Sequence, residues 1–102
     1  MNREPLDGYN YKYYAYPDGE IRYFKNKQYH IAKKLINEDG YTLVKLKRHF
    51  RTENYFLHAL IANRFIKFKN KYEPGFYVNH IDGNKQNNAV SNLEYLEGPS
   101  PY

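Results

Sequence analysis

The first half of the chain alternates between β-forming runs and turn-forming residues, and this pattern predicts antiparallel strands. Residues 11–25 (YKYYAYPDGEIRYFK) contain two such runs around a Pro-Asp-Gly turn at 17–19, which is typical of a β-hairpin. Residues 28–47 repeat the arrangement around an Asn-Glu-Asp-Gly turn at 37–40, and another turn is expected within 49–56. Three residues indicate an apolar face in the second hairpin: Tyr41, Leu43 and Leu46.

The apolar spacing changes to a helical period after residue 54. Apolar residues then recur three or four positions apart, and the alanines at 59 and 62 favour a helix. We therefore predict one main helix over about 56–67, with Asn54 as its N-cap. The apolar stripe of this helix is more typical of a core than of a ligand site, and it consists of Leu57, Leu60, Ile61 and Phe65.

The last stretch of the sequence predicts a second kind of hairpin. A Pro-Gly turn within 69–75 is expected to follow the helix, and 76–81 and 93–96 read as strands on either side of the polar loop 82–92. Two prolines in the tail 97–102 disfavour a further helix. The predicted fold class is α+β, with N-terminal antiparallel strands, one main helix and a C-terminal β-hairpin that carries a long Asn-rich loop. With 102 residues we expect a single domain, in which residues 1–53 form a β-rich N-terminal segment and residues 54–102 form the remainder.

Composition excludes several classes of site. The chain contains no cysteine, so disulfides and thiolate zinc sites are excluded. Its first ten residues lack the apolar segment of a secretory signal, and no stretch is long enough to span a bilayer. We therefore expect a cytoplasmic protein, with no membrane partner.

Positive charge is concentrated in the middle of the chain. From Arg22 to Lys71 there are 13 Lys or Arg against 3 Asp or Glu, a local balance of +10, whereas the remaining residues have a balance of −5. Basic side chains interleaved with aromatic ones suit a polyanion such as nucleic acid. A solvated basic face, or one aimed at an acidic protein that mimics DNA, would have the same composition. The residues expected to contact phosphates are Lys45, Lys47, Arg48, Arg51 and Arg64.

A histidine stands where the predicted strand 76–81 enters the Asn-rich loop. Lone histidines are more often structural than catalytic, and asparagine favours turns, so part of this enrichment is loop chemistry. The loop is nevertheless long for a plain hairpin connection. His80 is surrounded in sequence by polar residues: Asn79, Asp82, Asn84, Asn87, Asn88 and Asn92.

Two segments carry a resemblance to a known family. The sequences LHALIANRFI at 57–66 and VNHIDGNKQNNAVSNLEYL at 78–96 resemble the HNH endonucleases, in the branch of phage homing endonucleases. More weakly, the β-rich segments around 17–25 and 40–58 resemble the region that precedes the nuclease motif in that branch.

The resemblance implies a ββα-metal site on DNA. His80 matches the general base that deprotonates the attacking water, and Asn79 matches a metal ligand. Asn92 matches the residue that ties the loop together and orients the histidine, so His80 and Asn92 are the expected catalytic residues. The implied cofactor is a divalent cation, Mg²⁺ or Mn²⁺, and imidazole has a pKa suited to a base near neutral pH. An upstream histidine, here His58, is a further hallmark of some members, although a packed side chain is the alternative.

The sequence departs from the family after residue 96. There the family continues into a short helix that supplies the last metal ligand, whereas this sequence continues as EGPSPY. Asn79 is also a neutral ligand, so we expect a weakly held metal unless Asp82, Glu94, Glu97 or a second chain substitutes. Two hypotheses follow. One is a weak metal-dependent DNA endonuclease or nickase. The other is a catalytically inactive scaffold that binds nucleic acid or inhibits a host defence protein, such as a CRISPR effector or restriction enzyme.

Overall fold

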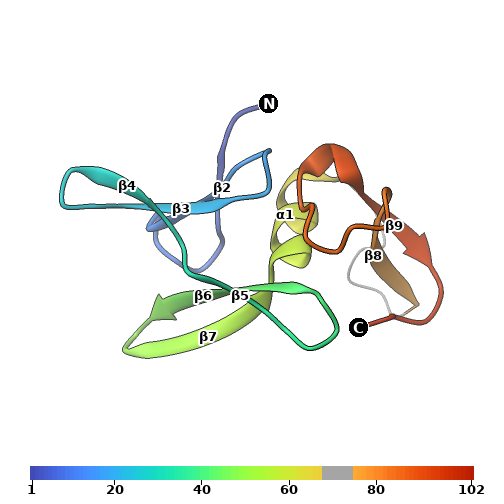
Figure 1. Cartoon of the computed structure of the whole chain (residues 1–102). Coiled ribbons are helices and arrows are strands. Elements are labelled where there is room, and N and C mark those ends of the chain that lie inside the picture. The colour runs from blue at the N-terminus through green and yellow to red at the C-terminus, as the bar shows by residue number, and fades with distance from the viewer. Residues whose placement is uncertain (68–74) are drawn as a thin grey trace.

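The computed structural model describes residues 1–67 and 75–102, and it has the predicted α+β class (Figure 1). The elements of the described residues are β1 (Glu4–Pro5), β2 (Tyr13–Ala15), β3 (Ile21–Lys25), β4 (Gln28–Ile31), β5 (Lys34–Ile36), β6 (Thr42–Arg48), β7 (Arg51–Phe56), α1 (Leu57–Phe65), β8 (Phe76–His80), the 3₁₀ helix η1 (Val90–Asn92) and β9 (Leu93–Glu97). None of the described helices is long and apolar enough to cross a membrane.

The N-terminal strands form two antiparallel sheets. One sheet has the order β1-β2-β3-β4 and the other the order β5-β6-β7. The predicted turns at 17–19 and 37–40 connect β2 to β3 and β5 to β6. The third predicted turn consists of His49 and Phe50, whose positive φ angles of 52° and 64° fit the two-residue type that matches the twist of a hairpin.

The pleat of β6 corrects one detail of the predicted apolar face. Tyr41 and Leu46 are buried as expected. Val44, which is fully buried, shares the face of Leu46, whereas Leu43 is only half-buried. Side chains two residues apart share a face of a strand, so the core face of β6 carries Thr42, Val44 and Leu46. The opposite face carries Leu43, Lys45 and Lys47.

Helix α1 is shorter than predicted and is not capped by Asn54, so that prediction was wrong. Asn54 lies within β7, opposite Lys45 of β6, because the strand ladder continues as far as Phe56. Phe56 takes the N-cap position, without a side-chain cap. The buried residues of the helix include Leu57 and Ile61 from the predicted stripe, together with His58 and Ala62.

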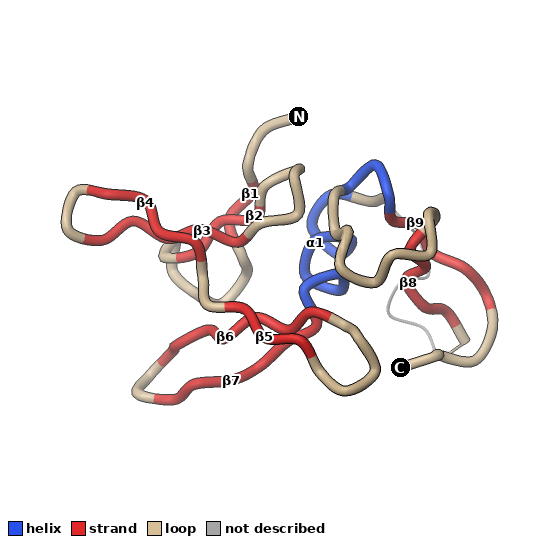
Figure 2. Tube along the Cα trace, viewed as in Figure 1, coloured by secondary structure: helices blue, strands red, loops and turns tan. Residues whose placement is uncertain are grey.

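The C-terminal hairpin agrees with the sequence pattern. Strands β8 and β9 pair antiparallel, with His80 opposite Leu93 and Asn79 opposite Glu94. The loop between them ends in η1 and lies beside α1, and the tail 98–102 contains no helix (Figure 2). The Pro-Gly turn predicted within 69–75 lies outside the described residues, apart from Gly75.

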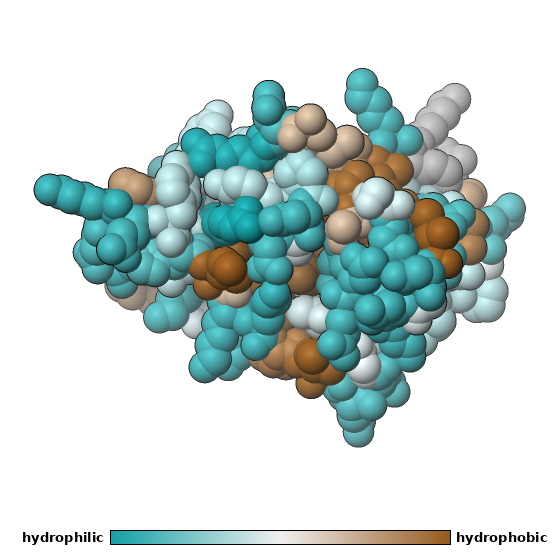
Figure 3. All heavy atoms as spheres, turned by 45° about the horizontal axis from the view of Figure 1, so that its top comes forward, coloured by the Kyte–Doolittle hydropathy of each residue, from teal (hydrophilic) through white to brown (hydrophobic). Residues whose placement is uncertain are grey.

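One continuous core joins the N-terminal sheets to the hairpin. It contains Ala15 and Ile21 from the first sheet, Ile61 from the helix, and Val78 and Leu93 from the hairpin. The N-terminal strands therefore support the hairpin directly. On the face shown in Figure 3, hydrophilic residues cover most of the surface and hydrophobic residues form separate patches.

A close backbone contact also joins the β2–β3 turn to the Asn-rich loop. The Val90 N–H donates to the Pro17 carbonyl oxygen at 3.0 Å. Gly19, with a φ of +91°, lies so near that a Cβ there would come within 2.5 Å of the Asn88 carbonyl carbon. Only glycine fits this position, because its φ is positive and no room exists for a side chain.

Candidate active site

Strand β8 separates the two residues at the centre of the motif. Val78 and His80 are buried, whereas Asn79 is half-buried, so the alternation of the strand points Asn79 and His80 to opposite sides. Asn79 faces its cross-strand neighbour Glu94, and the distance from Asn79 Nδ2 to Glu94 Oε2 is 3.4 Å. The arrangement places an imidazole on one side of the strand end and two oxygen-bearing side chains on the other.

The His80 ring is oriented by Asn88. His80 Nε2 lies 2.9 Å from Asn88 Oδ1, and both residues are buried. Asn88 Nδ2 points to the Gln86 carbonyl oxygen at 3.4 Å, which identifies Oδ1 as the acceptor toward the histidine. His80 therefore donates its Nε2–H, and the tautomer that does so keeps the lone pair of Nδ1 free to accept a proton.

Asn92 holds the two ends of the loop together, as predicted. Its Oδ1 accepts the Asp82 N–H at 3.0 Å, and its Nδ2 donates to Asp82 Oδ1 and to the Asn87 carbonyl oxygen, each at 2.9 Å. The residue is 8% exposed. These bonds satisfy loop backbone groups that would otherwise be unpaired.

Other loop side chains make the same kind of local bond. Asp82 Oδ1 accepts the Asn84 N–H at 2.7 Å, and Asn84 Oδ1 accepts the Gln86 N–H at 3.0 Å. Asn87 Nδ2 donates to Asp82 Oδ2 at 2.9 Å. The bonds from Asn87, Asn84 and Asn92 lower the pKa of Asp82. The amide-rich composition thus fixes the loop around a single carboxylate.

His58 lies beside His80. It belongs to an aromatic cluster that we define as Tyr41, Phe56, His58 and Tyr102. The His58 ring is fully buried and its centroid lies 5.2 Å from that of His80 and 4.5 Å from that of Tyr102. Neither of its ring nitrogens has a hydrogen-bond partner among the described residues. Burial, and secondarily the neighbouring His80, lower the pKa of His58 to about 4. His58 is therefore a neutral packed side chain.

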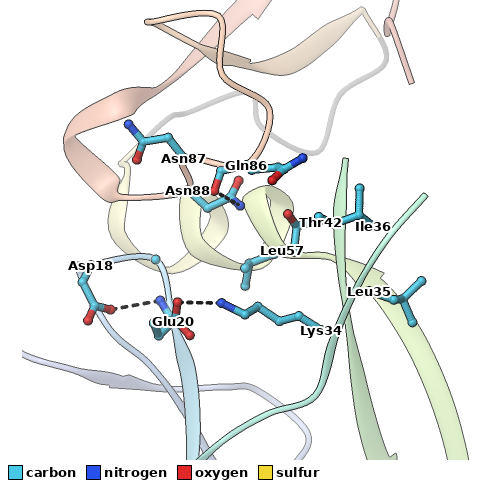
Figure 4. Close-up of a pocket in the computed structure, with 11 residues that line it drawn as sticks. Asp18, Glu20, Lys34, Leu35, Ile36, Thr42, Leu57, Gln86, Asn87 and Asn88 are labelled. Carbon is cyan, nitrogen blue, oxygen red and sulfur yellow. Dashed lines mark hydrogen bonds and ion pairs between the residues drawn. The ribbon is translucent and has the colours of Figure 1, made fainter. Parts of the chain in front are cut away.

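A pocket lies between the loop and the N-terminal sheets (Figure 4). Its volume is about 470 Å³, and its walls come from the β2–β3 turn, from β5 and β6, from the start of α1 and from the loop. Asn88 lines this pocket as well as contacting His80. Lys34 and Glu20 form an ion pair of 2.8 Å in its wall.

The five basic residues predicted to contact phosphates occupy different places. Lys45 and Lys47 share one face of β6, and Arg51 is exposed at the start of β7. The Arg48 guanidinium donates to the Gly8 carbonyl oxygen at 3.2 Å. Arg64 is paired with Asp7 at 3.1 Å and with Glu4 at 3.7 Å, so it would have to exchange carboxylates for a phosphate.

A divalent cation fits the chemistry of the Asn79 side of the hairpin. Asn79 and Glu94 each carry a side-chain oxygen, the ligand type that Mg²⁺ prefers, and in this structure the Asn79 Nδ2 group donates to Glu94 Oε2. Mg²⁺ commonly binds through one or two carboxylates plus water and substrate phosphates. No cluster of three or more His, Cys, Asp or Glu suited to a metal occurs in the described parts of the chain. Of the three proposed substitutes, Glu94 faces Asn79, Asp82 is engaged within the loop, and Glu97 lies opposite Phe76.

Comparison with known proteins agrees with this geometry. Residues 55–97, which cover the helix and the whole hairpin, match the family model of HNH endonucleases. The chain is 32% identical over 96 residues to the DNA endonuclease I-HmuI of Bacillus phage SP01. The structure described as DNA binding and cleavage by the HNH homing endonuclease I-HmuI superposes on 95% of the chain with a TM-score of 0.79 and 30% identity. The chain belongs to the HNH endonuclease family.

Within the HNH family, the similarity extends to viral proteins of greater length. The uncharacterized HNH endonuclease L245 of Acanthamoeba polyphaga mimivirus is 38% identical over 94 residues. Our chain spans 27% of L245 and 52% of I-HmuI, so it corresponds to about half or less of these relatives. Both the β-rich N-terminal segment and the HNH hairpin lie within the shared region, since 92% and 94% of this chain are covered.

Sequence reasoning did not assign a role to Asn88. The Asn-Asn pair at 87–88 reads only as turn chemistry, although its second member is the residue that contacts His80. A buried amide eight positions from the histidine is visible only after the loop is folded. Its position within a run of polar residues gave the sole hint.

Proposed function

We propose that the His80 region is the active site of a metal-dependent DNA endonuclease or nickase with weak activity. The observation that carries this proposal is the bond from His80 Nε2 to Asn88 Oδ1, 2.9 Å long, which leaves Nδ1 available as a base. His58, by contrast, packs in the aromatic cluster, and neither of its ring nitrogens has a hydrogen-bond partner among the described residues that would select a tautomer. Membership of the HNH family supports DNA as the substrate.

In this proposal His80 Nδ1 takes the proton from the water that attacks the phosphorus. The bond from the phosphorus to the leaving sugar oxygen breaks as the new P–O bond forms, and that oxygen takes a proton from solvent. Asn88 accepts the Nε2–H throughout, so it stabilises the imidazolium that forms and keeps the ring in place. Asn92 acts indirectly, because its three hydrogen bonds fix the loop from which Asn88 projects. His80 is thus the catalytic residue, and Asn88 and Asn92 are positioning residues.

Asn79 and Glu94 would bind Mg²⁺ or Mn²⁺. When bound, such a cation neutralises charge at the scissile phosphate. Because one of the two ligands is a neutral amide, we expect loose binding and an activity that needs millimolar cation. Loose positioning lowers rate steeply, which is why the proposed activity is weak.

The proposed substrate contacts are sequence-independent. Lys45, Lys47, Arg48 and Arg51 would contact phosphates, as would Arg64 after exchanging its carboxylate partners. Phosphate contacts release counterions, so DNA binding should weaken steeply as salt is raised.

Nicking of supercoiled plasmid in Mg²⁺ or Mn²⁺ tests the proposal. We expect cation-dependent nicking by the wild type, and a loss of about 100-fold or more in His80→Ala. His30→Ala is the matched control, since His30 lies on β4 and bonds the Lys25 carbonyl oxygen rather than the loop. Equal cleavage by His80→Ala would refute the assigned base.

The second candidate is a catalytically inactive HNH scaffold that binds nucleic acid or inhibits a host defence protein, such as a CRISPR effector or restriction enzyme. The small metal-ligand set on the described residues favours it. If the wild type leaves plasmid intact with every divalent cation but binds and inhibits such an enzyme, this second function replaces the first.

A further inference from the structure

Lys85 joins the Asn-rich loop to the β5–β6 turn. Its ammonium donates to the Asp39 carbonyl oxygen at 2.8 Å, although the two residues are 46 positions apart in the sequence. The same ammonium lies 4.7 Å from the centroid of the Tyr41 ring. The Lys85 Cδ lies 3.6 Å from the point where a Cβ would stand on Gly40, so the stem also packs along the turn. These three contacts attach the loop to a separate part of the fold.

Neutral groups, rather than a carboxylate, hold the Lys85 ammonium. None of the ion pairs found among the described residues involves Lys85. An exposed lysine samples many rotamers, and fixing it in one of them costs side-chain entropy. A charge-assisted hydrogen bond and a cation–π contact together offset that cost. The contacts of Lys85 are therefore those of an attachment point in the fold.

Asn37 fixes the acceptor side of this attachment. Asn37 Oδ1 accepts the Asp39 N–H at 3.1 Å and the Tyr41 N–H at 3.0 Å. The Gly40 N–H donates to the Asn37 carbonyl oxygen at 3.0 Å, and the Asn37 N–H donates to the Tyr41 carbonyl oxygen at 2.9 Å. Because these bonds hold the turn, the Asp39 carbonyl oxygen has a set position before Lys85 reaches it.

The attachment lies beside the His80 site. Tyr41 is 5% exposed, and its ring centroid lies 6.2 Å from that of His80 and 5.5 Å from that of His58. The Tyr41 ring therefore links the loop lysine to both histidines.

Two attachments hold the part of the loop that carries Asn88. Lys85 binds the β5–β6 turn, and the Val90 N–H donates to the Pro17 carbonyl oxygen in the β2–β3 turn at 3.0 Å. Asn88 lies between these two points in the sequence, and its Oδ1 lies 2.9 Å from His80 Nε2. The segment is therefore fixed at both ends, which restricts how far the Asn88 amide can move.

We propose that Lys85 is a positioning residue that keeps Asn88 within hydrogen-bond reach of His80. This inference rests on the proposed function, because it concerns the same base. Without the Lys85 ammonium the segment loses one of its two attachments, and the Asn88 amide spends less time at His80 Nε2. The imidazole then loses the partner that selects its Nε2–H tautomer. Turnover falls as a result, whereas affinity for DNA changes little.

A direct contact between Lys85 and a DNA phosphate is the alternative that the experiment separates. Such a contact would contribute to binding, so its loss would raise KM. It would leave the tautomer of His80 unchanged, because the tautomer is set in the free protein.

Nitrogen-15 NMR spectra of the histidine side chains test the positioning role without DNA or metal. The shifts of Nδ1 and Nε2 distinguish the two neutral tautomers, and the spectra are recorded at about pH 8, above the ordinary pKa of histidine. Lys85→Met keeps the length of the stem and removes the ammonium. In this variant the share of the Nδ1–H tautomer of His80 should rise about threefold or more. Lys85→Arg keeps a cationic donor that can stack on Tyr41, so it should resemble the wild type.

Lys27→Met is the matched control. It removes the same charge from an exposed lysine in the β3–β4 turn, and Lys85 is exposed as well, so the core should stay folded in both variants. The control should leave the His80 spectrum unchanged.

The plasmid nicking assay adds a kinetic readout. Lys85→Met should lower kcat by about 5- to 10-fold and leave KM within about twofold, whereas Lys85→Arg should retain most of the rate. An unchanged His80 tautomer in Lys85→Met, or an equal change in Lys27→Met, would overturn the proposal. A raised KM with an unchanged kcat and tautomer would also overturn it and make Lys85 a phosphate contact. A tautomer change in Lys85→Met without any nicking by the wild type would leave the positioning role standing and remove the nuclease function.

Discussion

Two histidines with ring centroids only 5.2 Å apart lie in opposite surroundings. His80 faces the amide-rich loop and has Asn88 as a partner at 2.9 Å. His58 lies in the aromatic cluster, fully buried and without a partner for either nitrogen among the described residues. The polar region selects one tautomer and leaves a proton acceptor, whereas the apolar region only keeps its ring uncharged. Two histidines at one site can therefore have different roles, and the groups that surround each ring decide which role it has.

The comparison is tested most strongly by acid. The folded pKa of His58 is about 4, below the ordinary value of 6.5. Between these values the unfolded chain binds a proton that the folded chain does not, so stability is complete above pH 6.5 and falls as pH drops toward 4. The loss from this one group should reach about 3 kcal/mol at pH 4.

Urea unfolding of wild type and His58→Leu at pH 7 and pH 4 measures that loss. The variant should be as stable as the wild type or more so at pH 7, because two unpaired nitrogens are replaced by apolar atoms. Between pH 7 and pH 4, the variant should lose about 3 kcal/mol less of its free energy of unfolding than the wild type loses. Parallel losses in both proteins would mean that His58 is not kept neutral by its surroundings.

The polar region is tested next by Asn92→Ala. This change removes three hydrogen bonds and leaves the Asp82 N–H at the start of the loop without its acceptor. We expect a loss of about 2 to 3 kcal/mol in the free energy of unfolding. Asn84→Ala, which removes one bond from an exposed side chain, should cost under about 1 kcal/mol. Similar costs for the two variants would contradict the central place of Asn92.

Substitutions of Asn88 test whether this residue orients the His80 ring. If the proposed base is right, Asn88→Ala should lower plasmid nicking by about 10- to 100-fold, as for other partners that orient a functional histidine. Asn88→Asp keeps an acceptor for the Nε2–H and should recover much of the rate. Its carboxylate also favours imidazolium, so the pH profile should move to higher pH. A purely structural Asn88 would give neither the recovery nor the shifted profile.

The smallest expected effect concerns the edge of the aromatic cluster. The Tyr102 hydroxyl accepts the Val78 N–H at 2.9 Å, and burial raises the pKa of Tyr102. Tyr102→Phe retains the ring against His58 but removes this acceptor, so we expect a loss of about 1 kcal/mol. Tyr77→Phe, on the same hairpin, is a matched control and should change the melting temperature less.

The fold was predictable where periodicity and turn chemistry agree. The turns at 17–19 and 37–40, the strand at 76–80 and the helix beginning near 57 all follow from local pattern. The Asn54 cap failed because pairing with β6 holds that residue in a strand, and pairing partners are invisible to local reasoning. His80 and Asn92 could be named from the motif, but Asn88 could not, since its contact depends on how the whole loop folds.

The close contact between Gly19 and Asn88 makes the conformation of the Asn-rich loop depend on the β2–β3 turn, which lies far away in the sequence. No side chain can be added at Gly19 without moving the backbone that carries the His80 partner. A substitution of Gly19 should therefore disturb the loop that carries Asn88, although Gly19 lies in the N-terminal turn. The geometry around His80 thus depends on a residue about 70 positions away in the sequence.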